Sequence, residues 1–207
     1  MYEMNPLWEN YYNELKPDKR KKMLKELIAS GEDDGADGLR QKLLKKRHTD
    51  PKDPGHQVDM FLMECAYLPS LYRKRKFFLV NMKNEIKRTK AHLCLDDVDK
   101  YTEMEKNALY WELRNAAKRY FKTCTGSRYG NRLMGISKAS EDEKVRLAGR
   151  DAWQMSVGIA RYCWQEKEMA VFCDAVKDAY VDYFEDGLEI YEHFAEKFKD
   201  DEPMRRK

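Results

Sequence analysis

One segment near the middle of the chain has residues suited to holding an anion. The sequence TGSRYGNRLMGIS, residues 125–137, contains three glycines and two arginines. Glycine amides and arginine side chains bind phosphate or carboxylate groups, because both present N–H donors to negatively charged oxygens. The anion-binding candidates in this segment are Ser127, Arg128, Tyr129, Asn131 and Arg132.

The same segment also fits a purely structural role, which we favour. Residues 130–137 nearly match the phosphate-binding motif GxxxxGK[S/T], but Ile136 replaces the lysine that contacts the β- and γ-phosphates. The segment also follows a helical pattern, whereas that motif follows a strand, so we exclude nucleotide hydrolysis by this motif. In the structural interpretation Gly126 ends the preceding helix. Anion binding is the second interpretation, because about thirteen residues is long for a helix connection.

A second candidate surface lies between Arg73 and Lys90, which includes eight basic residues and a single acidic one. Phe77 and Phe78 lie among them. Basic side chains contact phosphate backbones and exposed aromatic rings stack on bases, so the run could bind nucleic acid. On a helix, the same phenylalanines fit a core covered by long basic side chains, which is the interpretation we favour. The basic-surface candidates are Arg73, Lys74, Arg75, Lys76, Lys83 and Lys87.

Potential metal ligands occur close together in one further segment. Histidines and aspartates can ligate metal ions, but their spacing here matches no compact zinc motif. The aspartates also stand where helix caps and turns need them. We therefore predict no metal and no cofactor. The residues considered are His48, Asp50, Asp53, His56 and Asp59.

Acidic residues recur at helical spacing near the C-terminal end. A di-iron bundle combines such carboxylates with a Glu-x-x-His motif, which the chain lacks. Motifs of metalloproteases, serine hydrolases and dinucleotide-binding enzymes are also missing, so we assign no catalytic residue. We expect the acidic row to be a solvated helix face. The row consists of Asp178, Asp182, Asp186, Glu189 and His193.

The elements that would carry these residues are helical almost throughout. Apolar residues recur at steps of three and four, and alternating strand patterns are nearly absent. Four positions have residues suited to cap helices: Asn5, Asp53, Asp96 or Asp97, and Ser140. Gly31 is suited to end a helix, and Pro69 is expected to interrupt one. The sequence predicts an all-α fold of about seven or eight helices in an antiparallel bundle-like array, with no significant β-sheet.

The last third of the chain has a sustained apolar stripe over residues 145–194, although Glu166 interrupts its phase and Gly187 offers a later break. A single helix of about 50 residues would exceed the usual length, so we expect a turn near residues 165–167 and an antiparallel pair. The alternative is one long helix that forms a homodimer through residues 145–194. We predict a single domain over residues 1–199, which could divide near residues 125–139, and a frayed tail at residues 200–207.

Charge is unevenly distributed along the 207 residues. The net charge is +3, with a balance of +6 over residues 1–94 and −3 over residues 95–207. We expect the basic N-terminal half to pack near the acidic C-terminal helix; the alternative is a basic surface for an anionic partner.

Five widely spaced cysteines without a CxxC pair fit a reducing compartment. The sequence has no signal-peptide pattern and no long apolar stretch, so we expect a cytoplasmic protein that does not contact a membrane.

Three segments together resemble an uncharacterised all-helical family of unknown function from anaerobic gut Firmicutes. They are NPLWENYYNELKPDKRKKML, HTDPKDPGHQVDMFL and GSRYGNRLMGI. The resemblance implies a stand-alone cytoplasmic bacterial protein and supplies no catalytic residues.

The residues themselves predict a helical protein that acts by binding another protein. The first alternative is binding of nucleic acid or another polyanion through residues 73–90 and 125–137. The second is an enzyme whose site forms only in the folded chain.

Overall fold

The computed structural model describes residues 4–45, 53–73, 79–93, 100–126, 140–158 and 170–199. In these residues every regular element is helical and no strand occurs, which confirms the all-α prediction. Eight of the nine described α-helices have seven or more residues. The elements are η1 (Pro6–Trp8), α1 (Glu9–Asn13), α2 (Pro17–Ala29), α3 (Asp37–Leu44), α4 (Gly55–Arg73), α5 (Leu79–His92), α6 (Glu103–Gly126), α8 (Glu141–Gly158), α9 (Ala170–Tyr183) and α10 (Gly187–Lys197).

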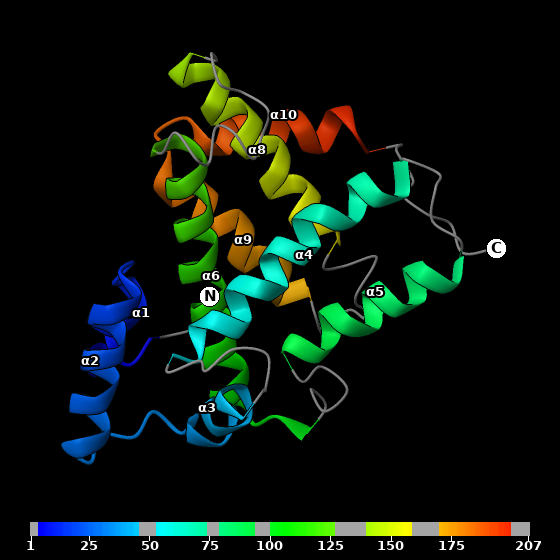
Figure 1. The fold of residues 1–207 in the computed structure, drawn as a ribbon. Helices are drawn as coiled ribbons and strands as arrows, with labels where there is room; N and C mark the ends of the chain where they lie inside the picture. The colour runs from blue at the N-terminus through cyan, green and yellow to red at the C-terminus, as the bar shows by residue number, and fades with distance from the viewer. Residues whose placement is uncertain are drawn as a thin grey trace.

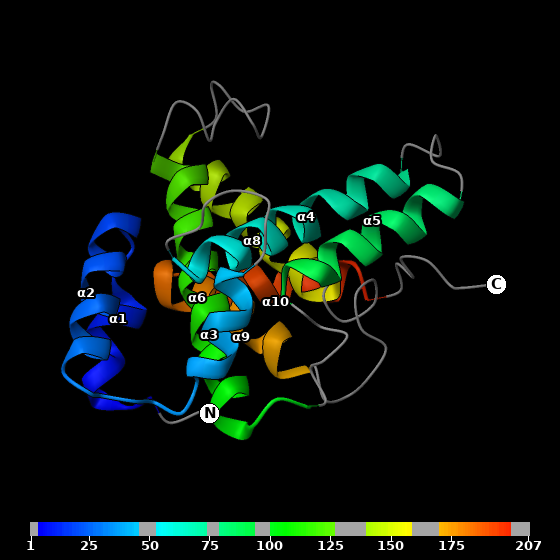
Figure 2. The same ribbon diagram turned by 60° about the horizontal axis from the view of Figure 1, so that its bottom comes forward.

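Helix α6 is the centre of the fold (Figure 1). It packs most extensively against α9 and also against α4, α8, α1 and α3. Small residues allow these close approaches, since Ala116 and Ala117 are buried on α6 and Ala175 and Ala179 are buried on α9. The N-terminal helices α1 and α2 lie together at one edge, while α5 packs chiefly against α4 on the other side (Figures 1 and 2).

Several predicted helix boundaries are confirmed by their hydrogen bonds. The Asn5 side chain accepts a bond from the Leu7 amide at 3.0 Å, and Pro6 follows it at the first helical position. The Ser140 hydroxyl accepts a bond from the Glu143 amide at 3.2 Å. Gly31 adopts a φ of 77° just after α2, the left-handed conformation that favours glycine at a helix end.

Two predicted boundaries were wrong. Pro69 does not interrupt its helix, because α4 continues to Arg73. A proline removes one backbone hydrogen bond, but packing against neighbouring helices can hold the chain helical on both sides. Helix α6 does not start from Asp96 or Asp97. It begins at Glu103, where Thr102 accepts a bond from the Glu105 amide at 3.1 Å and the Glu105 carboxylate accepts one from the Thr102 amide at 2.9 Å.

The segment from residue 140 to residue 199 contains separate helices, not one long helix. Helices α8 and α9 pack against each other, and α10 begins at Gly187 after a break at residues 184–186. The turn expected at residues 165–167 lies outside the described residues. Among the described residues, six members of the apolar stripe are buried within the chain's own core, and a homodimer through residues 145–194 stays a prediction. These buried members are Ala148, Ala152, Met155, Val176, Tyr180 and Phe194.

Helices α8, α9 and α10 approach most closely at Gly149. A Cβ atom there would lie 2.6 Å from the Tyr180 hydroxyl oxygen and 2.7 Å from Ile190 Cγ2. The Tyr180 hydroxyl is fixed by donating to the Val145 carbonyl at 2.8 Å. Even one methyl group at this position must therefore displace packed neighbours.

Replacing Gly149 by alanine should destabilise the protein by about 1–3 kcal/mol through overpacking. Intrinsic helix propensity would act in the opposite direction, because alanine is favoured over glycine by about 1 kcal/mol. Urea denaturation measures the effect. The matched control is Gly38→Ala in α3, where the nearest atom is Glu105 Oε1, the carboxylate oxygen that does not accept from the Thr102 amide. Equal stabilisation by both substitutions would contradict the close packing at Gly149.

Candidate functional site: a buried arginine–carboxylate network

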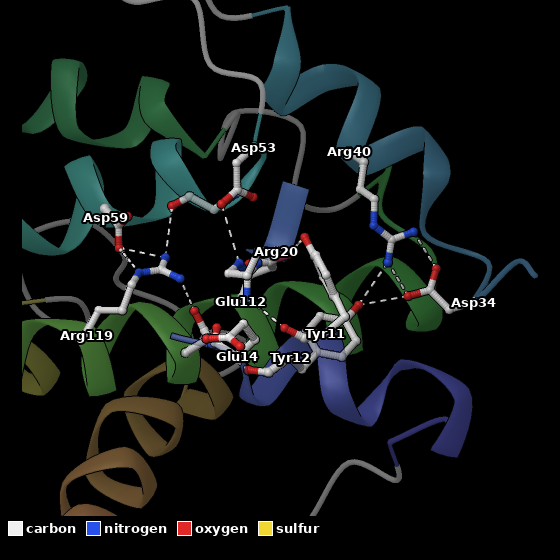
Figure 3. A network of polar contacts seen from close by, with 12 residues as sticks. Tyr11, Tyr12, Glu14, Arg20, Asp34, Arg40, Asp53, Asp59, Glu112 and Arg119 are labelled. Atoms are coloured by element: carbon white, nitrogen blue, oxygen red, sulfur yellow. Dashed lines mark hydrogen bonds and ion pairs between the residues drawn. The ribbon is translucent and has the colours of Figure 1, made fainter. Parts of the chain in front are cut away.

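A network of buried charged and hydrogen-bonding side chains joins the N-terminal helices to α4 and α6 (Figure 3). Three arginines hold it together, each from a different helix. Most of its members are almost fully buried, which is unusual for charged groups and calls for internal partners. We call this the buried polar network: Tyr11, Tyr12, Arg20, Asp34, Arg40, Asp53, Asp59, Glu112, Asn115 and Arg119.

Arg20 of α2 is the most deeply buried of the three arginines, with 0% exposure. Its guanidinium is bound to the Glu112 carboxylate of α6 and donates to the Tyr11 carbonyl at 3.2 Å. Its Nε lies 3.4 Å from Asp53 Oδ2, at the start of α4. The Tyr11 hydroxyl donates to Glu112 at 2.6 Å, and the guanidinium lies 4.3 Å from the centre of the Tyr11 ring. One arginine therefore connects α1, α2, α4 and α6.

Helical periodicity explains why Arg20 points inward although its neighbours are lysines. Pro17 starts α2 at its first position, and the helix packs its apolar side on α1 and the core. Arg20 lies four residues before the buried Leu24 and seven before the half-buried Leu27, so the three share one helix face. The lysines on either side of Arg20 fall on other faces.

Arg119 of α6 connects α4 with the C-terminal end of α1. It donates to Asp59 Oδ1 from Nε at 3.0 Å and from Nη2 at 2.8 Å, and it also contacts the Asn115 side-chain oxygen. The Asn115 amide donates to the Tyr12 carbonyl at 2.6 Å and to the Glu14 carbonyl at 2.8 Å. These bonds satisfy backbone carbonyls that the short helix α1 leaves without helical partners.

Arg40 of α3 forms the third node. Its two terminal nitrogens bind the two oxygens of Asp34, one of them at 2.6 Å, in the bidentate geometry that arginine makes with carboxylates. One nitrogen also donates to the Tyr12 hydroxyl at 2.9 Å, and that hydroxyl donates to Asp34 at 2.8 Å. The guanidinium lies 4.0 Å from the centre of the Trp8 ring, a cation–π distance.

The surroundings fix the protonation of these groups. Burial, together with nearby Glu112 and Asp34, raises the pKa values of the Tyr11 and Tyr12 phenols well above the usual range, so both act as neutral donors. Burial opposes the charge on Arg20, but Glu112, Tyr11 and Asp53 outweigh it and hold its pKa above normal. Burial also raises the pKa of Asp59, which Arg119 partly offsets. The arrangement pairs charges inside the fold and suits cross-linking of helices better than acid–base chemistry.

A second set of polar contacts corrects the prediction for the acidic row on α9. Asp178 accepts a hydrogen bond from the Tyr110 hydroxyl of α6. Asp182 is paired with Arg114 and lies 3.5 Å from the Lys118 ammonium. Asp178 is half-buried against α6, which the prediction of a solvated face missed. Asp182 is exposed although it pairs with α6, and Asp186, Glu189 and His193 are exposed, as expected.

The acid Asp151 makes another polar contact, between α8 and α6. Its side chain is only 13% exposed and accepts bonds from the Tyr120 hydroxyl at 3.0 Å and from Arg150 at 3.3 Å. Burial raises the pKa of this carboxyl, although Arg150 and Tyr120 act in the opposite direction. The carboxylate form is thus less favoured in the folded chain than in the unfolded one.

The structure places few of the sites predicted from the sequence. The five anion-binding candidates in residues 127–132 lie outside the described residues, as do three basic-surface candidates in residues 74–76. Arg73 ends α4, while Lys83 and Lys87 lie on α5, where Lys87 is exposed.

The histidine–aspartate segment has a different role where it is described. His48 and Asp50 lie outside the described residues. The Asp53 side chain caps the start of α4 by accepting from the Gly55 amide at 3.0 Å, and Asp53 and Asp59 both bind arginines. In the described part of the chain, no three His, Cys, Asp or Glu side chains are grouped so that they could hold a metal ion.

Sequence reasoning missed the buried polar network. One local signal could have predicted it: a charged or amide side chain at a helical position that the periodicity assigns to the core. Arg20 shows it on α2, and Glu112 and Asn115 show it on α6 among the buried residues Leu109, Leu113 and Ala116. Their partners are about a hundred residues away in sequence, so the pairing itself leaves no local pattern.

Comparison with protein-family models matches residues 6–193 to a family of unknown function, DUF6553. The chain belongs to the DUF6553 family. The match confirms the resemblance to a family of unknown function, while the bacterial source inferred with it stays a prediction. No curated protein and no solved structure matches the chain. The matched range includes every residue of the buried polar network. Among the described helices of this DUF6553 chain, none is both long enough and apolar enough to span a bilayer.

Replacing Arg20 by methionine should destabilise this DUF6553 chain by about 3–5 kcal/mol, because Glu112 and Asp53 would stay buried without their cation. The neighbouring Lys19→Met change is the control. Lys19 is exposed and lies 3.8 Å from the half-buried Glu14, so its loss should alter stability by less than about 0.5 kcal/mol. Urea denaturation of both variants tests the difference. Equal, small effects would show that the buried ion pairs do not secure α2.

An Asp151→Asn variant should change the pH dependence of stability. Folding raises the pKa of Asp151, so the protonated carboxyl stabilises the folded chain. This contribution to the free energy of unfolding is fully present below the unfolded pKa and is lost as pH rises through the folded pKa. The asparagine stays neutral, so the variant should gain stability relative to wild type between about pH 4 and pH 7. Denaturation across this range measures the difference. The exposed Asp186→Asn variant is the control, and parallel curves for wild type and Asp151→Asn would contradict the argument.

Proposed function

We propose that this chain acts by binding an acidic segment of another protein on the outer face of α2. One observation supports the proposal above all others: α2 buries its only arginine and turns its lysines outward. Arg20 is fully buried, Lys21 is half-buried and the other lysines are exposed, with the Lys22 side chain 79% accessible. We call the outward residues that share one side of the helix the lysine face of α2: Lys21, Lys22, Lys25 and Ile28.

The lysine face is open and its charges are weakly engaged. Helix α2 lies at the outer edge of the fold and packs against α1 (Figure 2). Lys21 lies 3.7 Å from Asp18, and Lys22 lies 3.7 Å from Glu26. Such exposed pairs along one helix contribute only about 0.3–0.5 kcal/mol each, so the lysines can exchange these partners for carboxylates of a bound chain.

The composition of this face favours a protein partner over a nucleic acid. Asp18 and Glu26 stand among the lysines, so the face lacks the uniform positive charge that tracks a phosphate backbone. Ile28 is 54% exposed and lies one turn beyond Lys25, so an apolar contact is available beside the charges. Protein interfaces combine an apolar contact with a charged rim, whereas nucleic-acid surfaces are more strongly positive.

The basic side of α5 supports a second candidate function, the binding of a polyanion. Helix α5 packs chiefly against α4, and its Lys87 is exposed. Arg88 is less available for a phosphate, because it binds both carboxylate oxygens of Glu64 at 2.9 Å. This candidate depends on the basic run from Arg73 to Lys90 acting together.

Fluorescence anisotropy with a short labelled poly-glutamate peptide tests the proposed function. Wild type should bind the peptide at low salt, and Lys21→Glu/Lys22→Glu/Lys25→Glu should weaken binding at least about tenfold, since three attractive contacts become repulsive. The matched control, Lys83→Glu/Lys87→Glu on α5, should bind the peptide like wild type. Lys22, Lys25 and Lys87 are exposed and Lys21 is half-buried. Circular dichroism verifies that the variants fold.

A single-stranded RNA of the same charge, measured in parallel, separates the two candidates. Tighter binding of RNA than of peptide, lost in the α5 variant, would instead support the polyanion function. Failure of wild type to bind the peptide even at low salt would overturn the proposed function of the lysine face.

A further inference from the structure

We propose that a second copy of this chain supplies an acidic partner, by placing its helix α10 on the lysine face of α2. The inference rests on the proposed function of that face and names one occupant for it. The observation behind it is that the chain has a matching face of opposite charge elsewhere on its surface. We call this the acidic face of α10: Leu188, Glu189, Glu192 and Glu196 on the helix, with Glu185 in the turn before it.

Helix α10 separates apolar and acidic residues on opposite sides. Phe194 is buried, and Ile190 and Tyr191 pack partly against the core, so these residues fix the inner side. The acidic residues, at steps of three and four, share the outer side and are all exposed. Lys199 pairs with Glu196 at the C-terminal end, and among the described residues no ion pair engages the other three glutamates.

The two faces match in length and in pattern. Helices α2 and α10 have 13 and 11 residues, which correspond to about 20 and 16 Å of helix. Each face has one exposed aliphatic residue beside its charges: Ile28 on α2 is 54% exposed and Leu188 on α10 is 47% exposed. Contact between the faces would pair lysines with glutamates while covering both aliphatic side chains, as in protein interfaces with an apolar centre and a charged rim.

The fold prevents the two faces from meeting within one chain. Helix α2 packs against α1 at one edge, whereas α10 packs against α8 and α9, well away from α2 in both views (Figures 1 and 2). The expected packing of the basic N-terminal half on the acidic C-terminal helix therefore does not occur between these two helices. The pairing is available only between copies, and it is head-to-tail, so it produces rings or open chains of copies.

Sedimentation velocity over a wide range of protein concentration tests the inference. The sedimentation coefficient of wild type should rise with concentration at low salt. It should return to the monomer value near 1 M salt, where the Debye length shortens to about 3 Å. Lys21→Glu/Lys22→Glu/Lys25→Glu should remain a monomer at low salt, and so should Glu185→Lys/Glu189→Lys/Glu192→Lys. The α5 variant Lys83→Glu/Lys87→Glu is the matched control and should associate like wild type.

Mixing the two charge-reversed variants provides the most specific measurement. Each variant alone carries charge of the same sign on α2 and α10, so its copies should repel each other. In the mixture, the acidic α2 of one variant can meet the basic α10 of the other, so association should return. A mixture that stays monomeric would overturn the inference even if wild type associates. Wild type that binds poly-glutamate but remains a monomer at every concentration would overturn this inference alone. Loss of both peptide binding and association would overturn the proposed function as well.

Discussion

The buried charge of Arg20 imposes a constraint on the whole N-terminal half of the fold. Removing a guanidinium from water costs several kcal/mol unless carboxylates and hydrogen-bond acceptors surround it. Here those groups are the Glu112 carboxylate, Asp53 and the Tyr11 carbonyl, which belong to α6, the start of α4 and α1. All of these elements must be in place together for the charge to be satisfied. Arrangements of the N-terminal helices that separate Arg20 from Glu112 are therefore strongly disfavoured.

The rest of the buried polar network extends this constraint along α6. Asn115 holds the end of α1 through two carbonyls, and Arg119 holds α4 through Asp59, while apolar contacts of Trp8 and the two tyrosines supply the surrounding core. Apolar packing is nearly non-directional, so it stabilises several similar arrangements of helices. Hydrogen-bonded ion pairs depend on distance and angle. In this fold the ion pairs fix how the helices are oriented, while burial of aromatic side chains provides stability.

The sequence allowed prediction of what depends on local periodicity, and little of what depends on distant pairing. Apolar spacing and capping residues located most helices, including the break at Gly187. Pro69 was misjudged because tertiary packing outweighed a local breaker, and the true cap of α6, Thr102, was overlooked in favour of earlier aspartates. Arg20 looks like one more cation in a basic run. Only its position opposite Glu112, 92 residues away, gives it a separate role, and sequence spacing carries no trace of that contact.

The alternation of inward arginine and outward lysine in α2 has a consequence for how this family can diverge. Lys19 and Lys21 flank Arg20 in sequence, yet they project from other sides of the helix. Changes on the outer side leave the ion pairs beneath untouched, so the surface charge of α2 can change while the architecture is retained. Neighbouring positions of this helix are therefore under different constraints: Arg20 must keep its buried partners, whereas the lysines beside it set the charge of the surface.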